Sequence, residues 1–412
     1  MSALVIITYG EDNQSLDTQS LKAVVEVRVE QEMSKPYRYA IRFEDHVCEG
    51  KIAISTQSNL QPGTIIGVFV KEGDADAMRC LVRGPIDKIK SSVATGGSGS
   101  WFECHGLDMR AMMGVTEYSA TWTGFAHTHI ENLISDGGFT PDVEDTTIEY
   151  DTRNKLTQSG TNLAFCEKVA KENNFEFWVS YSGEVITQAA DGSKTATVTE
   201  TLHFKHSPSD MVPGASDSLI TIPLLPDTSD LELIVNPSGE DECKGNTLSF
   251  EMDIDAERVT AAYFTAQRDG NLEPSQAFSG IDPPDDPANS NSPANGNNAA
   301  EVVNEQRLVV VEPTGSVEEQ RLRAEAELAE SRWFIQAKCS TAQHLLGRSV
   351  FPHDIAFVKG VSHMHIGTYQ ITKVVHVVTQ EHHLMDLTLR RNTFNFEPQK
   401  AETDTSLRVA NA

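Results

Sequence analysis

Two stretches near the N-terminus alternate between apolar and mostly polar side chains. From Val25 to Val29, and again from Tyr37 to Phe43, every second residue is apolar. Successive side chains of a strand point to opposite faces, so this pattern predicts half-buried antiparallel strands. A turn at Gln61-Pro62-Gly63 precedes further strands. These are expected at 64–70, 80–90 and 101–107, with a Gly/Ser-rich loop at 95–100, and residues 1–115 are thus predicted to form a β-barrel or closed sheet.

Helical signals replace this alternation after residue 115. Thr128 and Glu131 have the spacing of a capping box, and Gly137-Gly138 supplies a stop after an apolar stripe. A second helix is predicted at 162–173, followed by an aromatic strand at 175–180 with a hairpin partner at 183–189. Residues 116–200 are therefore predicted to be a small α+β domain inserted between β-rich stretches.

The remaining residues are again mostly β in pattern. Short strands at 201–245 would complete the first barrel, and residues 246–395 are predicted to form a second one. Ser316 and Glu319 form a second capping box. Within 246–395 we expect strands at 308–311, 355–358, 367–378 and 384–391, a helix at 316–336 and a flexible Pro/Asn-rich loop at 273–300, before a C-terminal tail at 396–412. The predicted fold class is mainly β (α+β), with two tandem tube-like barrels, an inserted α+β domain and a peripheral helix.

A short internal similarity bears on this architecture. Ile86-Asp87-Lys88-Ile89 and Ile371-Thr372-Lys373-Val374 are each followed, at the same offset, by an alternating strand at 102–104 and 387–389. Two similar hairpins would mean two copies of one barrel in a single chain. The same motif is also common in unrelated amphipathic strands, so the sequence leaves duplication and coincidence as alternatives.

Composition narrows the possible functions. A length of 412 residues predicts two to four domains, and 60 acidic against 33 basic side chains give a net charge of −27. This charge repels phosphate backbones and anionic lipid, which argues against specific nucleic-acid binding. No apolar run could span a bilayer, and the run at 3–7 is too short for a signal peptide. The scattered cysteines fit synthesis in a reducing cytosol without a membrane anchor; they are Cys48, Cys80, Cys104, Cys166, Cys243 and Cys339.

Signatures of catalysis are missing from the chain. The motifs of nucleophile elbows, P-loops and zincin helices are absent, and Gly97-x-Gly99 precedes a strand, unlike a dinucleotide loop. With so many carboxylates, no pair stands out as a glycosidase acid and base. We therefore predict no enzyme, no catalytic residues and no cofactor. Phe175, Phe177 and Trp178 favour a core over a carbohydrate platform.

Several histidine and aspartate groups could suggest a metal. Zinc sites need three or four clustered ligands, and no Cys or acidic residue lies at partner spacing, so hydrogen-bonded or surface roles are favoured and no metal site is predicted. His382-His383 is expected in a solvated turn. The acidic group lacks the ligand spacing of an EF-hand loop. The groups are His127/His129, His203/His206, His363/His365 and Asp282/Asp285/Asp286.

Two separated stretches resemble the phage late-control D family and the N-terminal hub part of VgrG proteins. The first is a polar entry, a helix and an aromatic strand, at 155–178, preceded by a helix that ends at Gly138-Phe139. The second runs from Gly367-Thr368-Tyr369 to His376 and exits at Arg391-Asn392. Both occur in the family's order, over about a quarter of the chain. Thr161-Asn162 replaces the common Ser-Asp at the helix start, and 273–300 is similar to an insertion.

The resemblance implies a baseplate hub of a contractile injection system or phage tail. Such a hub is a homotrimer and a symmetry adaptor, in which two barrels per chain join a hexameric inner tube to a trimeric spike. Because the chain ends soon after Asn392, the spike would be a separate protein. Other baseplate components are expected partners, and the protein is expected to be made in the bacterial cytoplasm and assembled into the particle as a virion component.

Two other classes of function remain open. A tail-associated peptidoglycan-degrading enzyme would need an inserted hydrolase domain, for which only 116–200 has room. An adhesin or solute-binding protein is disfavoured by the missing export signal. The sequence alone does not separate a phage from a bacteriocin-like particle, an extracellular injector or a secretion system.

Overall fold

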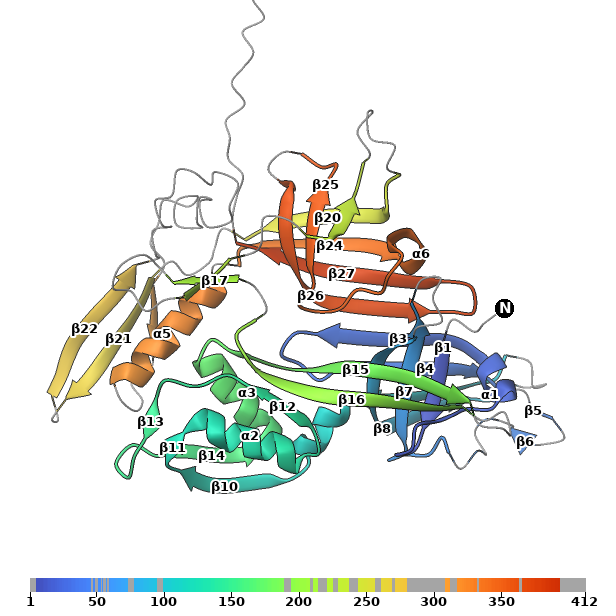
Figure 1. Ribbon diagram of the computed structural model, residues 1–412, viewed down its shortest axis with the longest axis horizontal. Coiled ribbons are helices and arrows are strands. Elements are labelled where there is room, and N and C mark those ends of the chain that lie inside the picture. The colour runs from blue at the N-terminus through green and yellow to red at the C-terminus, as the bar shows by residue number, and fades with distance from the viewer. Residues whose placement is uncertain are drawn as a thin grey trace, which may run out of the picture.

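The computed structural model confirms a mainly β fold (Figure 1). One mixed sheet of 16 strands runs through the molecule, and helices cover only part of it. The residues that the structure describes are 5–45, 47–48, 51–52, 54, 57, 59–72, 78–94, 99–188, 194–207, 210–213, 221–224, 229–236, 244–255, 261–268, 271–279, 308–311, 317–331, 333–362 and 365–392.

The N-terminal part forms a group of strands that we call repeat 1. Its strands are ordered β1-β7-β8-β9-β4-β3, all antiparallel, and the long strand β8 pairs first with β7 and then with β9. The bounds are β1 (Val5–Tyr9), β3 (Val24–Glu32), β4 (Arg38–Glu44), β7 (Ile65–Lys71), β8 (Met78–Ser92) and β9 (Trp101–Leu107), with short elements β2 (Gln14–Ser15), α1 (Thr18–Lys22), β5 (Val47–Cys48) and β6 (Lys51–Ile52) beside them.

An α+β insert follows repeat 1; in Figure 1 its helices lie to the left of and below repeat 1, and its hairpin β15-β16 extends toward repeat 1. Two helices cover the long hairpin β15-β16, and β16 joins repeat 1 through one pair with β2. The elements are η1 (Met109–Gly114), β10 (Glu117–Trp122), β11 (Gly124–Phe125), α2 (Ala126–Asp136), β12 (Thr140–Val143), β13 (Glu149–Tyr150), β14 (Leu156–Thr161), α3 (Asn162–Glu172), β15 (Glu176–Gln188) and β16 (Lys194–Lys205).

The strands from β19 onward that lie above repeat 1 in Figure 1 form repeat 2; β19 and β20 are drawn in yellow-green and yellow and the others in orange and red. Their order is β19-β25-β26-β27-β24-β20. The bounds are β19 (Leu231–Ile234), β20 (Thr247–Ile254), β24 (Ile335–Ala342), α6 (Gln343–Leu346), β25 (Ile355–Lys359), β26 (Gly367–Val378) and β27 (His383–Arg391).

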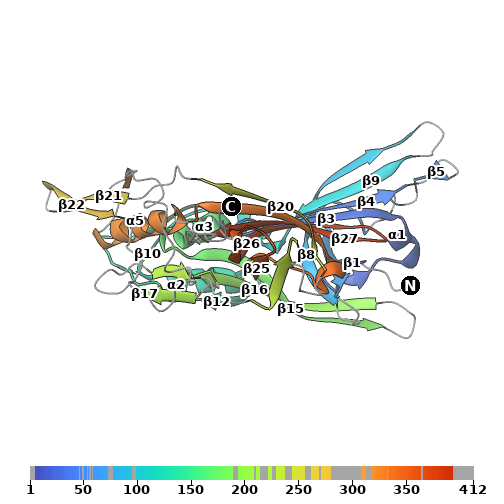
Figure 2. The same ribbon diagram turned by 90° about the horizontal axis from the view of Figure 1, so that it is seen from above.

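A peripheral group of elements lies at the far end of the molecule from repeat 1, as Figure 2 shows from above. It consists of β17 (Asp210–Pro213), β18 (Thr221–Leu224), β21 (Ala261–Arg268), β22 (Asn271–Ser279), β23 (Leu308–Val311) and α5 (Val317–Ser331). Of the helices in the described part of the chain, none combines the length and apolar character that crossing a membrane requires.

Two separate apolar cores hold these parts together. The larger core joins repeat 1 to the insert, and Phe43, Phe69, Phe177 and Phe204 are completely or almost completely buried in it. The smaller core fills repeat 2 and includes Phe334. Since burial of a large apolar side chain contributes roughly 1.5–3 kcal/mol, each core is substantial enough to stabilise its own set of strands.

Several local predictions need correction. Helix α2 begins at Ala126 after Phe125, without a side-chain cap, so Thr128 lies inside the helix and does not cap it. Helix α5 ends at Ser331, because Gln336 belongs to β24. The strand predicted to return at 183–189 instead continues β15 through a register shift, and β16 is its partner.

Two further predictions, the loop at 273–300 and the completion of the first barrel by strands at 201–245, differ in part from the structure. Residues 273–279 of the expected loop belong to strand β22, while 280–300 lie outside the described residues, as does the tail 396–412. Strand β19, which falls in the stretch expected to complete the first barrel, pairs with β25 of repeat 2.

Candidate assembly interface

Repeats 1 and 2 have the same order of strands, and the chain follows the same path through five of the six. Strands β1, β3, β4, β7, β8 and β9 correspond in sequence order to β19, β20, β24, β25, β26 and β27. Every neighbouring pair is antiparallel in both repeats except the first, which is antiparallel as β1-β7 and parallel as β19-β25. Six strands in one shared arrangement are unlikely to arise twice by chance, so the structure supports the duplication reading of the sequence similarity.

The register of pairing is also the same in the two repeats. Each repeat has a register shift after the isoleucine of the shared motif, so that Ile86 and Lys88 correspond to Ile371 and Lys373. A second shift follows Val24 in β3 and Thr247 in β20. Because a bulge adds one unpaired residue and changes the local twist, two bulges at matching positions give both repeats the same curvature.

A tight turn before the second strand of each hairpin repeats as well. The amide nitrogen of Gly63 donates to the carbonyl of Ile86, and the amide nitrogen of Ile86 donates to Thr64. His353 and Asp354 make the same two bonds with Ile371. Gly63 and His353 both adopt positive φ, at 86° and 74°, a conformation in which a non-glycine residue is uncommon. The turn geometry is therefore kept although the residue types differ.

One strand of repeat 1 pairs directly with repeat 2. Residues Val27–Glu32 of β3 lie antiparallel to residues Lys373–Val378 of β26, and we call this pairing the internal junction. Lys373 forms ion pairs with Glu30 and, at 3.4 Å, with Glu32. These contacts raise the pKa of Lys373. Burial raises the pKa of Glu32, but Lys35 and then Lys373 outweigh burial and hold it below its usual value. The two repeats are thus joined by backbone hydrogen bonds and by charge.

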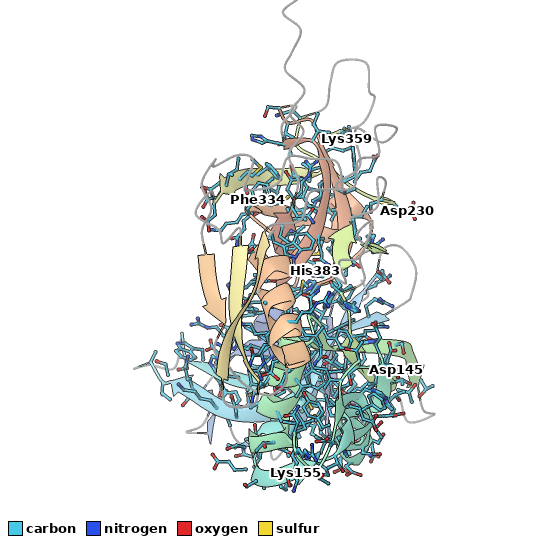
Figure 3. All side chains as sticks on the ribbon, turned by 90° about the vertical axis from the view of Figure 1, so that its left-hand side faces the viewer. Asp145, Lys155, Asp230, Phe334, Lys359 and His383 are labelled. Carbon is cyan, nitrogen blue, oxygen red and sulfur yellow. The ribbon has the colours of Figure 1, made fainter. Side chains whose placement is uncertain are left out.

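A chain of buried polar side chains crosses the internal junction. The side-chain nitrogen Nε2 of Gln31 donates to the carbonyl of Leu81 at 2.6 Å. The side-chain oxygen of Gln31 therefore faces His376 and accepts from its Nε2 at 3.1 Å. Nδ1 of His376 then accepts from Nε2 of His383 at 2.9 Å. In Figure 3 His383 lies near the middle of the molecule, between repeat 2 and the parts below it.

Both histidines of this chain are held neutral. Burial lowers the pKa of His383 to about 4, and burial together with His383 holds the pKa of His376 well below its usual range. The prediction of a solvated His382-His383 turn is therefore half wrong: His382 is exposed, but His383 points into the junction and is only 4% exposed. Sequence reasoning missed it because the partner, His376, lies on the neighbouring strand.

Among the strand edges that have no partner strand in the described part of the molecule, two belong to repeats 1 and 2 at corresponding places. Strand β20 is the last in its sheet and pairs only with β24. The C-terminal half of β8, from Lys88 to Ser92, pairs only with β9. Such edges present rows of unpaired N–H and C=O groups and are ready to accept a further strand.

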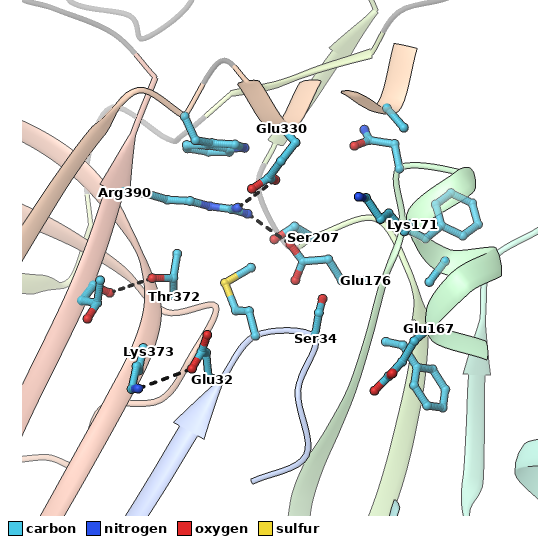
Figure 4. A pocket seen from close by; sticks show the side chains of 18 of the residues that line it. Glu32, Ser34, Glu167, Lys171, Glu176, Ser207, Glu330, Thr372, Lys373 and Arg390 are labelled. Atoms are coloured by element: carbon cyan, nitrogen blue, oxygen red, sulfur yellow. Dashed lines mark hydrogen bonds and ion pairs between the residues drawn. The ribbon is translucent and has the colours of Figure 1, made fainter. Parts of the chain in front are cut away.

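A cleft of about 640 Å³ lies where α3, β15, α5 and the hairpin β26-β27 meet (Figure 4). At its centre Arg390 bridges Glu176, at 3.1 Å, and Glu330, at 3.4 Å, and stacks over Trp333. Burial raises the pKa of Glu176 to about 7, against the lowering effect of Arg390. The cluster ties repeat 2 to the insert and the peripheral helix, and no sequence motif pointed to it.

A second buried ion pair fixes the insert to repeat 1. Arg110 is completely buried and binds Asp108 at 2.6 Å, while it donates to the carbonyls of Lys35 and Phe177. The side chain of Asp108 also accepts from the backbone of Tyr37. This group has all its partners inside the protein, which is typical of a structural network.

The histidine pairs of the sequence analysis are separated by the fold into individual hydrogen-bonded sites. His203 binds Asp142 and Ser180, His206 binds Glu144, and His127 binds Thr146. His129 contacts the carbonyl of Thr123. No cluster suited to a metal occurs among the described residues. His363, Asp282, Asp285 and Asp286 lie outside them.

The aromatic residues that sequence analysis assigned to the core are buried. Phe175 and Phe177 belong to the larger core, and Trp178 stacks between His203 and His353 with ring centroids at 4.6 and 4.3 Å. A carbohydrate platform needs exposed rings, so the core assignment is confirmed.

No protein-family model and no curated protein sequence matches the chain. Among solved structures, a tail protein from Neisseria meningitidis MC58 is 11% identical with a TM-score of 0.57, covering 95% of this chain and 97% of that one. The 43 kDa tail protein of prophage MuSo2 from Shewanella oneidensis is 11% identical with a TM-score of 0.57, covering 95% of this chain and 99% of that one. A type VI secretion component, Escherichia coli c3393, is 11% identical with a TM-score of 0.47, covering 93% of this chain and 76% of that one. The chain has the fold of phage tail proteins, as predicted.

Proposed function

We propose that the chain is the baseplate hub of a phage tail or contractile injection system, a homotrimeric adaptor between a hexameric inner tube and a trimeric spike. The observation that carries the proposal is the repetition of six strands, with shared register and shared bulges, in one chain. A threefold assembly can contact a sixfold tube evenly only when each subunit offers two similar faces. The two repeats are such faces, and the tail-protein fold supports the same role.

In this proposal repeats 1 and 2 are the two tube-like barrels and the insert lies at the periphery. The protein acts through its geometry, without catalysis, and assembles with spike, tube and other baseplate components into the particle. The predicted domain limits 1–115, 116–200 and 246–395 remain part of the proposal. The insert as defined here extends beyond 116–200 at both ends, from η1 to β16, and β19 pairs within repeat 2.

Mass and symmetry of the purified protein test the proposal. Light scattering should give three times the chain mass of 45.2 kDa, and end-on negative-stain images should show a ring with six similar lobes. A protein that stays monomeric even after addition of its spike and tube proteins would contradict the proposal.

One observation favours a second function, a tail-associated peptidoglycan-degrading enzyme. Glu176 lies in a cleft with its pKa raised to about 7, a value suited to a general acid. Its engagement with Arg390 favours a structural role. Zymography on purified peptidoglycan separates the two: clearing that disappears in Glu176→Gln would support the enzyme, and absence of clearing by the wild-type protein supports the hub.

A further inference from the structure

The internal junction has a counterpart in which, among the strands that the structure describes, both edges lack a partner. Strand β3 corresponds to β20, and β26 corresponds to β8. Within the chain, β3 pairs with β26. We propose that, in the trimer, β20 of one chain pairs antiparallel with the C-terminal half of β8 in the next chain; this inference rests on the proposed function.

The arrangement closes a ring with one kind of contact. Each chain supplies one internal junction, from repeat 1 to repeat 2, and one pairing from its repeat 2 to repeat 1 of its neighbour. Both run in the same head-to-tail sense, so three chains give six similar junctions in alternation. A head-to-tail contact that closes after a fixed rotation produces a ring, whereas a self-complementary contact would stop at a dimer.

The internal junction also fixes the register of the new pairing. Lys373 lies opposite Glu32 and Val378 opposite Val27. The matching bulges translate β26 positions into β8 positions and β3 positions into β20 positions without ambiguity. The resulting pairs are Lys88 with Asp255, Ile89 with Ile254, Lys90 with Asp253, Ser91 with Met252, Ser92 with Glu251 and Val93 with Phe250.

Charge supports this register independently of the topology. In the internal junction Lys373 binds Glu30 and Glu32. The counterparts of these three residues are Lys88, Asp253 and Asp255, so a cation again faces two carboxylates. Lys88 and both aspartates are exposed in the single chain. Since like charges placed opposite each other destabilise a strand pair, a register that joins unlike charges at each of these positions is selective.

Lys90 strengthens the same pattern. It is directly opposite Asp253 in the proposed register, where the internal junction has Val375, and it lies exposed in the single chain. The proposed register also places two apolar residues opposite each other at the end of the pairing. Val93 is 59% exposed in the single chain and would be covered by Phe250 of the next chain.

Disulfide trapping tests the register directly. Ser92→Cys with Glu251→Cys places two thiols opposite each other, within the Cα separation of about 4.4–6.8 Å that a disulfide accepts. The matched control, Ser92→Cys with Ser249→Cys, moves one partner by two residues. Oxidation should link chains in the first variant and not in the control. The two single variants should not be linked either, and because they retain the native cysteines they show that those cysteines do not react.

The outcomes separate this inference from the proposed function. A trimer that does not cross-link, or that cross-links equally in the control, overturns the pairing and leaves the hub intact. A protein that remains monomeric overturns both.

Charge reversal gives a second, independent test. Lys88→Glu should raise the concentration at half assembly by about tenfold or more, because three junctions per trimer each lose an attraction and gain a repulsion. Adding Asp253→Lys and Asp255→Lys should restore assembly. Lys155→Glu carries the same charge change at the far end of the insert and should not alter assembly (Figure 3). Equal effects of Lys88→Glu and Lys155→Glu would overturn the pairing.

Discussion

The buried histidine pair of the internal junction should make the protein sensitive to mild acid. Protonation of His383 requires a charge at a site that is only 4% exposed, and a proton on Nδ1 of His376 would convert the acceptor of this hydrogen bond into a donor that faces the N–H of His383. Folding therefore favours the neutral rings. A histidine whose folded pKa is depressed binds fewer protons in the folded state than in the unfolded state, so its stability contribution is lost as pH falls from about 6.5 to about 4.

The size of the effect follows from the pKa of His383. With values of about 4 when folded and 6.5 when unfolded, lowering the pH from 7.5 to 5 removes about 2 kcal/mol of stability through this residue alone. His376 acts in the same direction. The variant His383→Gln keeps an N–H that can donate to His376 but has no proton to gain, so it should lose less stability on acidification.

Urea denaturation at pH 7.5 and pH 5 measures the effect. The comparison is between the wild type and His383→Gln at each pH, since titration of all other groups then cancels. The free energy of unfolding of the variant, relative to the wild type, should improve by about 2 kcal/mol at pH 5. The substitution His382→Gln, at an exposed neighbouring residue, should leave the difference in unfolding free energy from wild type the same at both pH values. A difference between wild type and His383→Gln that is the same at both pH values would refute the reasoning.

Three further substitutions test other parts of the structure. Glu176→Gln removes a carboxyl whose raised pKa favours the folded state below about pH 7. In the same urea experiment, the free energy of unfolding of this variant relative to wild type should therefore rise by about 2 kcal/mol when the pH is raised from 5 to 7.5, whereas that of His383→Gln should rise when the pH is lowered. Arg110→Ala leaves Asp108 as an unpaired buried charge and should lower the free energy of unfolding by about 3–5 kcal/mol; a loss below 1 kcal/mol in urea denaturation contradicts this. Gly84→Ala puts a methyl group 1.9 Å from the carbonyl oxygen of Leu107 and should lower Tm strongly, whereas Gly114→Ala, whose nearest neighbour is at 3.5 Å, should be nearly neutral in thermal melts.

Local signals in the sequence predicted individual strands well. The strands at 101–107, 308–311 and 367–378 have the bounds that the sequence predicted. In the strand at 101–107 buried residues alternate with partly exposed ones, as the alternating pattern requires. The motif shared by Ile86–Ile89 and Ile371–Val374 also pointed to the repeat, and in the structure a register shift follows the isoleucine of each copy.

Contacts between distant segments were outside the reach of these signals. The partner of β15 is set by packing on the helices of the insert, and a local hairpin was the simpler expectation. Gln31, Leu81, His376 and His383 form one polar chain although they belong to four strands. Arg390 and Glu176 are separated by more than 200 residues and meet only in the folded protein. Such networks have no spacing rule in the sequence.

The two kinds of junction differ in a way that matches when each would form. The internal junction is made within one chain during folding, so it can bury neutral polar groups such as His376 and Gln31 that need fixed partners. Their counterparts at the proposed contact between chains, Ser91 and Ile254, make no comparable chain, and the selective groups there are charged and exposed.

Charged strand edges suit a contact whose two sides are exposed to solvent until the chains assemble. Lys88 and Lys90 on the free edge of β8 oppose self-pairing of two β8 strands, because each lysine would approach another lysine, and acidic residues on β20 have the same effect. Of these three pairings, only β8 against β20 brings unlike charges together. The charges that would select the correct neighbour thus also protect the single chain from edge-to-edge aggregation, which explains why the repeat keeps a lysine at this position while its neighbours change.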